Sequence, residues 1–322
     1  MGIIENFGKV MLNRSDLENI LDFYNLGNLK SYLTYPRESK HLQLCYCLST
    51  TTGKYFLKQY KEFDNFKHHG LFLVNYLLEN NYPSVKLFNS KNNNPYTEYN
   101  GSKVALFEFL DFTIVSNMTK NKAYQIGKYL GLLHKQTEFY PFFETFETYE
   151  YYYDLFLKYY SESKRLSCQL LKVIEYIKDN IENLKVPDYL PQSICHVEFT
   201  LEHIIFKHEK VFKIVDWDCV NRYYSFYDLG TTLVSSFDEE ILNFNYLAEI
   251  IKGYNKQREL TTWEKEHIFE AIQFGIFKFF LWGLSEATKQ NNNLTWGYNW
   301  VEEFMKYDKI KFYGELYKFI EF

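Results

Sequence analysis

The chain contains 322 residues with a formal net charge of −5, from 36 Lys and Arg against 41 Asp and Glu. This balance argues against nucleic acid as the main partner, because phosphate binding needs a surplus of basic side chains. We expect no membrane-spanning segment, because no window approaches about 18 consecutive apolar residues. The five cysteines are scattered without a CxxC pair, which predicts reduced, structural thiols in a cytoplasmic protein.

The first 110 residues are predicted to form a small antiparallel sheet with one helix. Period-two alternation on both sides of a Thr-Thr-Gly-Lys turn predicts a hairpin. Apolar residues at helical spacing, followed by Asn-Asn-Tyr-Pro, predict a helix with a defined end. The expected elements, in chain order, are strands at 41–48 and 55–58, a helix at 66–78, and strands at 85–88 and 104–110.

The rest of the chain is predicted to be mostly helical. Helices are expected at 123–134, 149–160, 166–184, 226–237, 246–254 and 263–284. Pro187 and Pro191 interrupt this pattern before a polar segment. The fold class is therefore α+β, with a small sheet lobe at 1–110 and a larger helical lobe at 111–322.

A segment in the helical part carries most of the chemical information. In phosphoryl-transfer enzymes a catalytic loop of the form H-x-D-x-x-x-x-N precedes a separate Asp that holds magnesium. The chain keeps this spacing with His196, an acid at Glu198, a side chain at His203, and then Asp216. Two residue types differ, because Glu replaces the expected Asp and His replaces the expected Asn.

These residues and six further segments resemble the aminoglycoside phosphotransferase and choline kinase superfamily, including its homoserine-kinase-like and spore-coat (CotS-like) branches. The resemblance covers about residues 25–285. It implies a bilobal protein-kinase-like fold that uses ATP and magnesium to phosphorylate a hydroxyl group of a small molecule. The matching segments are GKYFLK at 53–58, LFEFL at 106–110, IGKYLGLLH at 126–134, ICHVE at 194–198, IVDWD at 214–218, SFYDL at 225–229, GY at 253–254 and LT at 260–261.

The resemblance also implies a nucleotide site in the first lobe. Lys58 is expected to contact the α- and β-phosphates of ATP. Glu108, Phe109 and Leu110 correspond to the hinge strand that binds the nucleotide. An alternative for Lys58 is a solubility lysine on an edge strand. As a separate departure from the family, the helix at 66–78 contains no acid of the kind that kinases pair with this lysine.

In the second lobe the resemblance implies an acceptor site and a metal site. Glu198 is expected to orient and deprotonate the acceptor hydroxyl, while His196 braces the catalytic loop. Asp216 is expected to hold magnesium, with Asp218 and His203 as further candidate ligands. Glutamate adds one methylene, and a displacement of about 1 Å can lower a rate about a hundredfold. Imidazole is a poor magnesium ligand, so His203 is alternatively a structural histidine bonded to the loop backbone.

Two functions remain open on the sequence. The first is a small-molecule kinase whose acceptor the sequence does not specify. The second is a pseudokinase that acts as a binding or structural protein with a protein partner. The second is favoured by Glu198, by His203 and by a loop at 35–41 that lacks the glycines expected over the phosphates.

Overall fold

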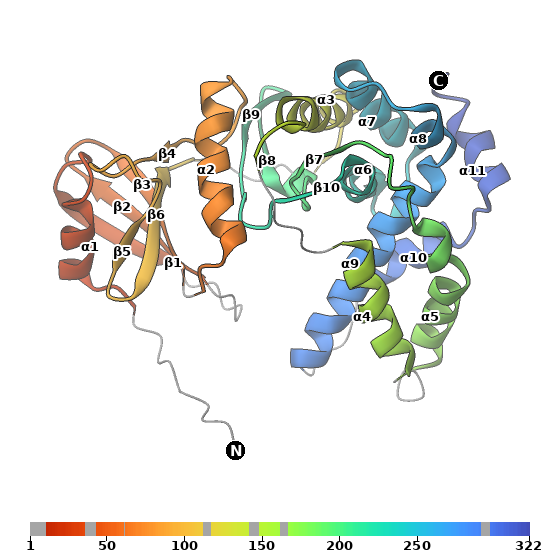
Figure 1. The fold of residues 1–322 in the computed structure, drawn as a ribbon, viewed down its shortest axis with the longest axis horizontal. Coiled ribbons are helices and arrows are strands. Elements are labelled where there is room, and N and C mark those ends of the chain that lie inside the picture. The colour runs from red at the N-terminus through yellow and green to blue at the C-terminus, as the bar shows by residue number, and fades with distance from the viewer. Residues whose placement is uncertain are drawn as a thin grey trace. The chain divides into compact units, whose positions relative to one another are not determined.

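The structure, a computed structural model, describes residues 11–35, 43–60, 62–111, 117–141, 148–161, 167–290 and 297–322. The chain forms two compact units, Met1–Phe112 and Thr113–Phe322. Each unit is described by itself, with its elements labelled in Figure 1.

The first unit is built on a six-stranded antiparallel sheet. Its order is β1-β2-β3-β6-β4, and β5 also pairs with β6. Helix α1 packs its apolar side on one face of this sheet, where Leu17 and Ile20 join Leu57 and Leu106 in a core cluster. The strands are β1 (Leu29–Tyr35), β2 (Gln43–Thr50), β3 (Lys54–Tyr60), β4 (Leu87–Phe88), β5 (Thr97–Tyr99) and β6 (Ser102–Glu108), with helices α1 (Arg14–Leu21) and α2 (Asn65–Glu79).

The predicted hairpin and helix of this unit are confirmed. Strands β2 and β3 pair antiparallel around the predicted turn, and α2 spans the predicted helix. The beginning of the predicted strand, at residues 41–42, and the glycine-free loop at 36–41 lie outside the described residues. Sequence reasoning missed α1, β1 and β5. Helix α1 is only two turns long and is fixed by a capping box between Asn13 and Asp16, a signal that apolar periodicity does not detect.

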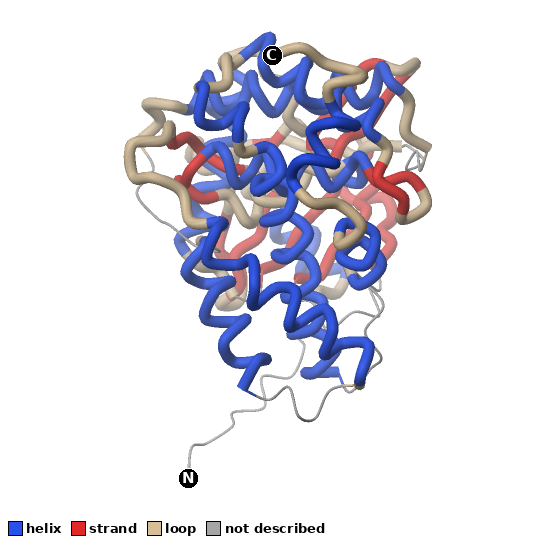
Figure 2. Tube along the Cα trace, turned by 90° about the vertical axis from the view of Figure 1, so that its right-hand side faces the viewer, coloured by secondary structure: helices blue, strands red, loops and turns tan. Residues whose placement is uncertain are grey.

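The second unit is mostly helical, as the blue elements of Figure 2 show. Two-stranded antiparallel pairs lie between the helices: the hairpins β8–β9 and β11–β12, and the pair β7–β10, whose strands are separated in sequence by β8 and β9. The helices are α3 (Lys120–Thr137), α4 (Tyr149–Ser161), α5 (Cys168–Asn180), α6 (Ser225–Leu233), α7 (Phe244–Gln257), α8 (Thr262–Glu266), α9 (Ile268–Gln290), α10 (Tyr298–Phe304) and α11 (Lys309–Leu316). The strands are β7 (Gln192–Cys195), β8 (Ile204–Lys207), β9 (Lys210–Ile214), β10 (Asn221–Tyr224), β11 (Phe237–Asp238) and β12 (Ile241–Leu242).

The single helix predicted at 263–284 is wrong, because the chain forms two helices separated at His267. The ring of His267 stacks on Trp263 with 3.8 Å between ring centroids. Its Nδ1 also bonds the Trp263 carbonyl at 2.7 Å. A capping box between Thr261 and Glu264 fixes the short helix α8 independently of α9. The helix predicted at 226–237 likewise ends earlier, at Leu233, and continues as a 3₁₀ turn.

Helix α9 contains an apolar segment, Ile268–Thr288, with a mean hydropathy of 1.3. By length and composition alone this segment could cross a membrane. Within the protein, however, 89% of it is buried. A helix that is apolar on all sides and surrounded by protein is typical of the core of a large domain.

Two glycines allow helices α3 and α7 to touch backbone to backbone. A Cβ atom at Gly127 would lie 1.8 Å from the Ile250 carbonyl oxygen. A Cβ atom at Gly253 would lie 2.0 Å from the Tyr124 carbonyl oxygen. Any larger residue would push the two helices apart, because backbone atoms cannot yield as a flexible side chain can.

Gly253→Ala should therefore lower the free energy of unfolding by about 1–3 kcal/mol or more, because its methyl group overpacks the crossing. Gly314→Ala is the matched control, since this helical glycine has open space around its added Cβ. The control should be neutral or stabilising by up to about 1 kcal/mol. Urea unfolding followed by circular dichroism measures both, and equal effects of the two substitutions would contradict the close crossing.

Candidate functional site

Lys58 lies on an interior strand of the first unit. In β3 it stands opposite Cys45 of β2 and Ala105 of β6, so strands flank it on both sides. The interpretation of Lys58 as an edge-strand lysine is therefore wrong. Its side chain is half-buried, with Nζ 5.9 Å from the centre of the Phe107 ring. Because side chains alternate along a strand, Lys58 lies on the face opposite to the Leu57 core.

The predicted hinge residues lie at the end of β6. The Glu108 carboxylate accepts a hydrogen bond from the Lys86 backbone N–H at 2.7 Å. The Glu108 N–H donates in turn to the Lys86 carbonyl at 2.9 Å. The neighbouring Phe109 ring lies 5.6 Å from the Lys54 ammonium. The Glu108 side chain thus fastens the start of the β4 segment to β6.

In the second unit a buried carboxylate organises the predicted catalytic loop. Asp228 lies in the first turn of α6 and is 2% exposed. Its Oδ2 accepts from the His196 backbone N–H at 2.8 Å and from His134 Nε2 at 3.0 Å. Its Oδ1 accepts from the Val197 N–H at 2.9 Å. One side chain therefore binds two successive amides of the loop and a histidine from α3.

The charges of this buried group are well defined. Burial alone would raise the pKa of Asp228, but the hydrogen bonds that it accepts from His134 and from the His196 backbone outweigh burial and hold that pKa below the ordinary value. Burial lowers the pKa of His134 below its ordinary value despite the nearby carboxylate. His134 is therefore neutral, donating from Nε2 to Asp228. Its Nδ1 accepts from the Tyr254 hydroxyl at 2.7 Å.

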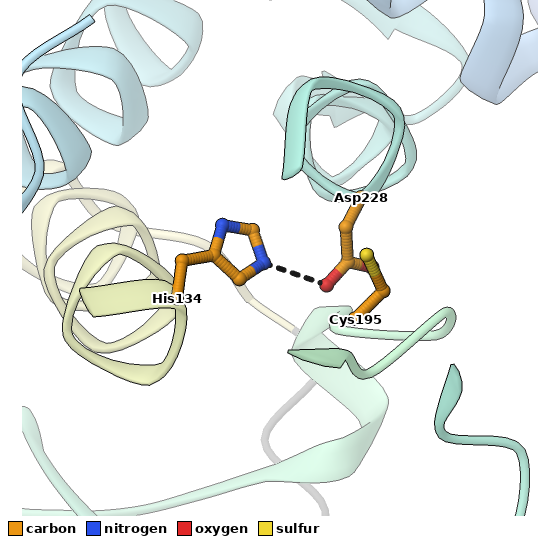
Figure 3. A group of neighbouring side chains, drawn as sticks. All are labelled: His134, Cys195 and Asp228. Atoms are coloured by element: carbon orange, nitrogen blue, oxygen red, sulfur yellow. Dashed lines mark hydrogen bonds and ion pairs between the residues drawn. The ribbon is translucent and has the colours of Figure 1, made fainter. Parts of the chain in front are cut away.

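Figure 3 shows Cys195 of β7 beside His134 and Asp228, and the three could offer metal-ligand atoms within 4.8 Å of one another. Their chemistry does not suit a metal. Both Asp228 oxygens already accept N–H groups. Burial raises the pKa of the Cys195 thiol well above its usual value, so the thiolate that a metal requires is disfavoured. This group is a structural support.

The loop residue just before Glu198 has an unusual backbone. Val197 has φ of 75°, a left-handed conformation that costs a β-branched residue about 1–3 kcal/mol. Asp228 holds its N–H, and the ammonium of Lys278 donates to its carbonyl oxygen. Lys278 is 4% exposed on α9. Sequence reasoning missed Lys278, although a lone charge within the apolar run 274–281 is a detectable signal.

His196 is fully buried between aromatic rings. Its centroid lies 5.4 Å from that of Phe199 and 4.7 Å from that of Trp217. Nε2 donates to the Val215 carbonyl at 3.1 Å. Burial, with a smaller effect of His203, lowers the pKa of His196 to about 4. This neutral ring joins the catalytic loop to the segment before Asp216.

Three half-buried side chains converge beyond this support. Glu198, His203 and Asp216 each offer one ligand atom, and these atoms lie within 4.8 Å of one another. His203 Nδ1 donates to the Glu198 carbonyl at 2.7 Å, while its Nε2 is 3.7 Å from Asp216 Oδ2. Asp216 has φ of 68°, which Asp tolerates better than most residues. Two of the three predicted metal ligands, His203 and Asp216, are in this group. The third, Asp218, is not, and its place is taken by Glu198, which was predicted to orient the acceptor.

Magnesium, which the resemblance implies, fits these residues only in part. Two carboxylates supply the hard oxygen ligands that this ion prefers. The third group is an imidazole nitrogen, which suits transition metals better. His203, which stands where the motif has the amide oxygen of an asparagine, is therefore a poor ligand for magnesium.

A model of the phosphotransferase enzyme family (APH) matches residues 44–268 of the chain. The chain belongs to this family. No curated protein sequence matches it significantly.

Solved structures of the same fold align over almost the whole chain. The spectinomycin phosphotransferase bound to ADP and spectinomycin is 12% identical, with a TM-score of 0.64 over 95% of this chain and 98% of that one. An amicoumacin kinase bound to AMP-PNP and Ca²⁺ is 13% identical, with a TM-score of 0.66 over 96% and 92%. A choline/ethanolamine kinase family protein from Mesorhizobium loti is 16% identical, with a TM-score of 0.59 over 94% and 96%. The predicted kinase-like fold is confirmed.

The buried histidines of this family member predict a pH-dependent stability. The pKa of His134 is lower in the folded protein than the value of about 6.5 in the unfolded chain, so the unfolded chain binds the proton. The contribution of His134 to the free energy of unfolding is therefore fully present above about pH 6.5, and it is lost as the pH falls below that value. His196 acts in the same direction. Its shift to a pKa of about 4 contributes about 3 kcal/mol to the free energy of unfolding at a pH above the unfolded value.

Urea unfolding at pH 7 and pH 5 should show a lower free energy of unfolding at pH 5. His134→Gln should reduce the difference between the two pH values. His208→Asn is the control, because His208 is an exposed residue of the β8–β9 turn with a left-handed φ of 50° that Asn also adopts. A wild type that is equally stable at both pH values would contradict the buried neutral histidines.

Proposed function

We propose that this protein transfers the terminal phosphoryl group of ATP to a hydroxyl group of a small molecule. The observation that carries the proposal is the convergence of Glu198 and Asp216 on a strained loop held by Asp228. Strained backbone of this kind clusters at functional sites, and Val197 lies directly before Glu198. Membership of the phosphotransferase family supports the same reaction class.

The proposed roles follow from the chemistry of each side chain. Lys58 would contact the nucleotide phosphates from its interior strand, and the hinge residues Glu108, Phe109 and Leu110 would border the nucleotide. Glu198 would orient the acceptor hydroxyl and take up its proton. Asp216 would help to hold a cation, whose contribution is to neutralise charge on the phosphates.

A small molecule is the proposed acceptor class. The neighbouring structures include a spectinomycin phosphotransferase, an amicoumacin kinase and a choline/ethanolamine kinase family protein. These molecules differ widely in shape and charge, so they support only the general class of a hydroxyl-bearing small molecule.

A pseudokinase is the second candidate, and specific observations favour it. The acid of the loop is a glutamate, and His203 stands where the motif has an amide. Helix α2 contains a single acid, Glu79, at its last residue, and buried Gly70 in its interior. The lysine–glutamate pair that kinases use to place ATP therefore has no counterpart within the body of α2.

Thermal unfolding with ADP or a non-hydrolysable ATP analogue, in the presence of Mg²⁺ or Mn²⁺, tests the proposal. A nucleotide at 100 times its Kd should stabilise the protein by about 2.7 kcal/mol. Phosphoryl transfer to a panel of aminoglycosides and amino alcohols, measured as ADP release, should fall about 100-fold or more in Asp216→Ala. Asp238→Ala, at an exposed aspartate of β11, is the control.

The outcomes separate the two candidates. Stabilisation together with transfer supports the kinase. Stabilisation without transfer to any acceptor supports the pseudokinase. No stabilisation by any nucleotide would contradict both the nucleotide site and the proposed reaction.

A further inference from the structure

We propose that Glu198, His203 and Asp216 bind a divalent transition-metal ion, represented by Zn²⁺ and Mn²⁺, in preference to Mg²⁺. The inference rests on the proposed function for the place of the cation. It goes beyond that function in naming the metal class and all three ligands. The metal can be titrated without nucleotide, so the two proposals fail separately.

The separations suit a small ion. Two ligands held about 2.1 Å from a tetrahedral ion lie about 3.4 Å apart. His203 Nε2 and Asp216 Oδ2 are 3.7 Å apart, and the Glu198 oxygen lies within 4.8 Å of both. A side-chain movement of a few tenths of an ångström would close the first pair around an ion.

The orientation of His203 is the strongest feature of the site. A carbonyl oxygen can only accept, so the 2.7 Å contact with the Glu198 carbonyl fixes the proton on Nδ1. In the neutral ring the lone pair is then on Nε2, which points toward Asp216. At 3.7 Å these two atoms are too far apart for a hydrogen bond. Metal-binding histidines almost always donate their other N–H to a carbonyl or carboxylate in this way.

The backbone holds the ligand-bearing segments together before any ion arrives. The Val215 N–H, one residue before Asp216, donates to the His203 carbonyl at 3.0 Å. The His203 N–H donates in turn to the Thr200 carbonyl at 3.1 Å. The ligands therefore come from a loop that is already closed on itself, which lowers the ordering cost of binding.

The selectivity follows from the ligand types. Two carboxylates bring a charge of −2 to a half-buried site, which favours any divalent cation. Magnesium demands a near-octahedral set of oxygens and sheds its water reluctantly. Transition metals accept the imidazole nitrogen, and their affinities for such mixed sites rise from Mn²⁺ to Cu²⁺, with Zn²⁺ below Cu²⁺ but above Mn²⁺. Replacing the amide of the motif by His203 thus moves the preference away from magnesium.

Isothermal titration of the full chain with Zn²⁺, Mn²⁺ and Mg²⁺, without nucleotide, tests the proposal. Zn²⁺ should bind more tightly than Mn²⁺, and Mn²⁺ more tightly than Mg²⁺. His203→Asn restores the amide of the motif and should weaken Zn²⁺ binding at least about tenfold, while Mg²⁺ binding is unchanged or tighter. Glu198→Gln keeps the side-chain shape and should weaken all three ions. His208→Asn, in the hairpin that follows, should change none of them.

Electron paramagnetic resonance of Mn²⁺ and the absorption spectrum of Co²⁺ identify the ligands directly. The expected Co²⁺ spectrum has weak d–d bands without charge-transfer bands from thiolate. Unchanged Zn²⁺ affinity in His203→Asn, Mg²⁺ bound as tightly as Zn²⁺, or a thiolate spectrum would each overturn the proposal. If the metal proposal fails in one of these ways but the protein still binds nucleotide, the proposed phosphoryl transfer is not contradicted.

Discussion

The hydrogen bonds of the Asp228 carboxylate hold the loop that carries Glu198. This carboxylate binds two successive loop amides and the neutral ring of His134, so one buried charge is shared among three donors. Leaving such a charge without its donors would cost several kcal/mol, which makes the arrangement all-or-none. Asp228 and Lys278 together hold Val197 in a left-handed conformation. They therefore also set the direction in which the Glu198 side chain leaves the loop.

This contact exists only because four helices approach closely. The glycine crossing of α3 and α7 brings the end of α3, with His134, against Tyr254 of α7. A second crossing joins α6 to α9, where a Cβ atom at Gly230 would lie 2.0 Å from the Ala271 carbonyl oxygen. The α6 crossing fixes Asp228, and α9 carries Lys278. Small residues at helix contacts thus determine the position of polar groups that lie elsewhere along the same helices.

Much of the fold could be predicted from the sequence, because apolar periodicity marks α2, β2 and β3 locally. The site could be predicted only in part. Spacing identified Glu198, His203 and Asp216, but it encodes neither the left-handed backbone at Asp216 nor which of the candidate ligands lie together. The order of strands around β3, which makes Lys58 interior, and the contact of Lys278 with the loop are long-range properties. No local pattern specifies which distant element a residue will meet.

Hydrogen–deuterium exchange at the backbone amides of His196 and Val197 tests the account most directly, in the wild type and in Asp228→Asn. We predict slow exchange of both amides in the wild type, because each donates to the buried carboxylate. In the variant both should exchange much faster, while amides in the middle of α7 keep their protection. Equal protection in the two proteins would contradict the claim that Asp228 holds the loop at His196–Glu198 in place.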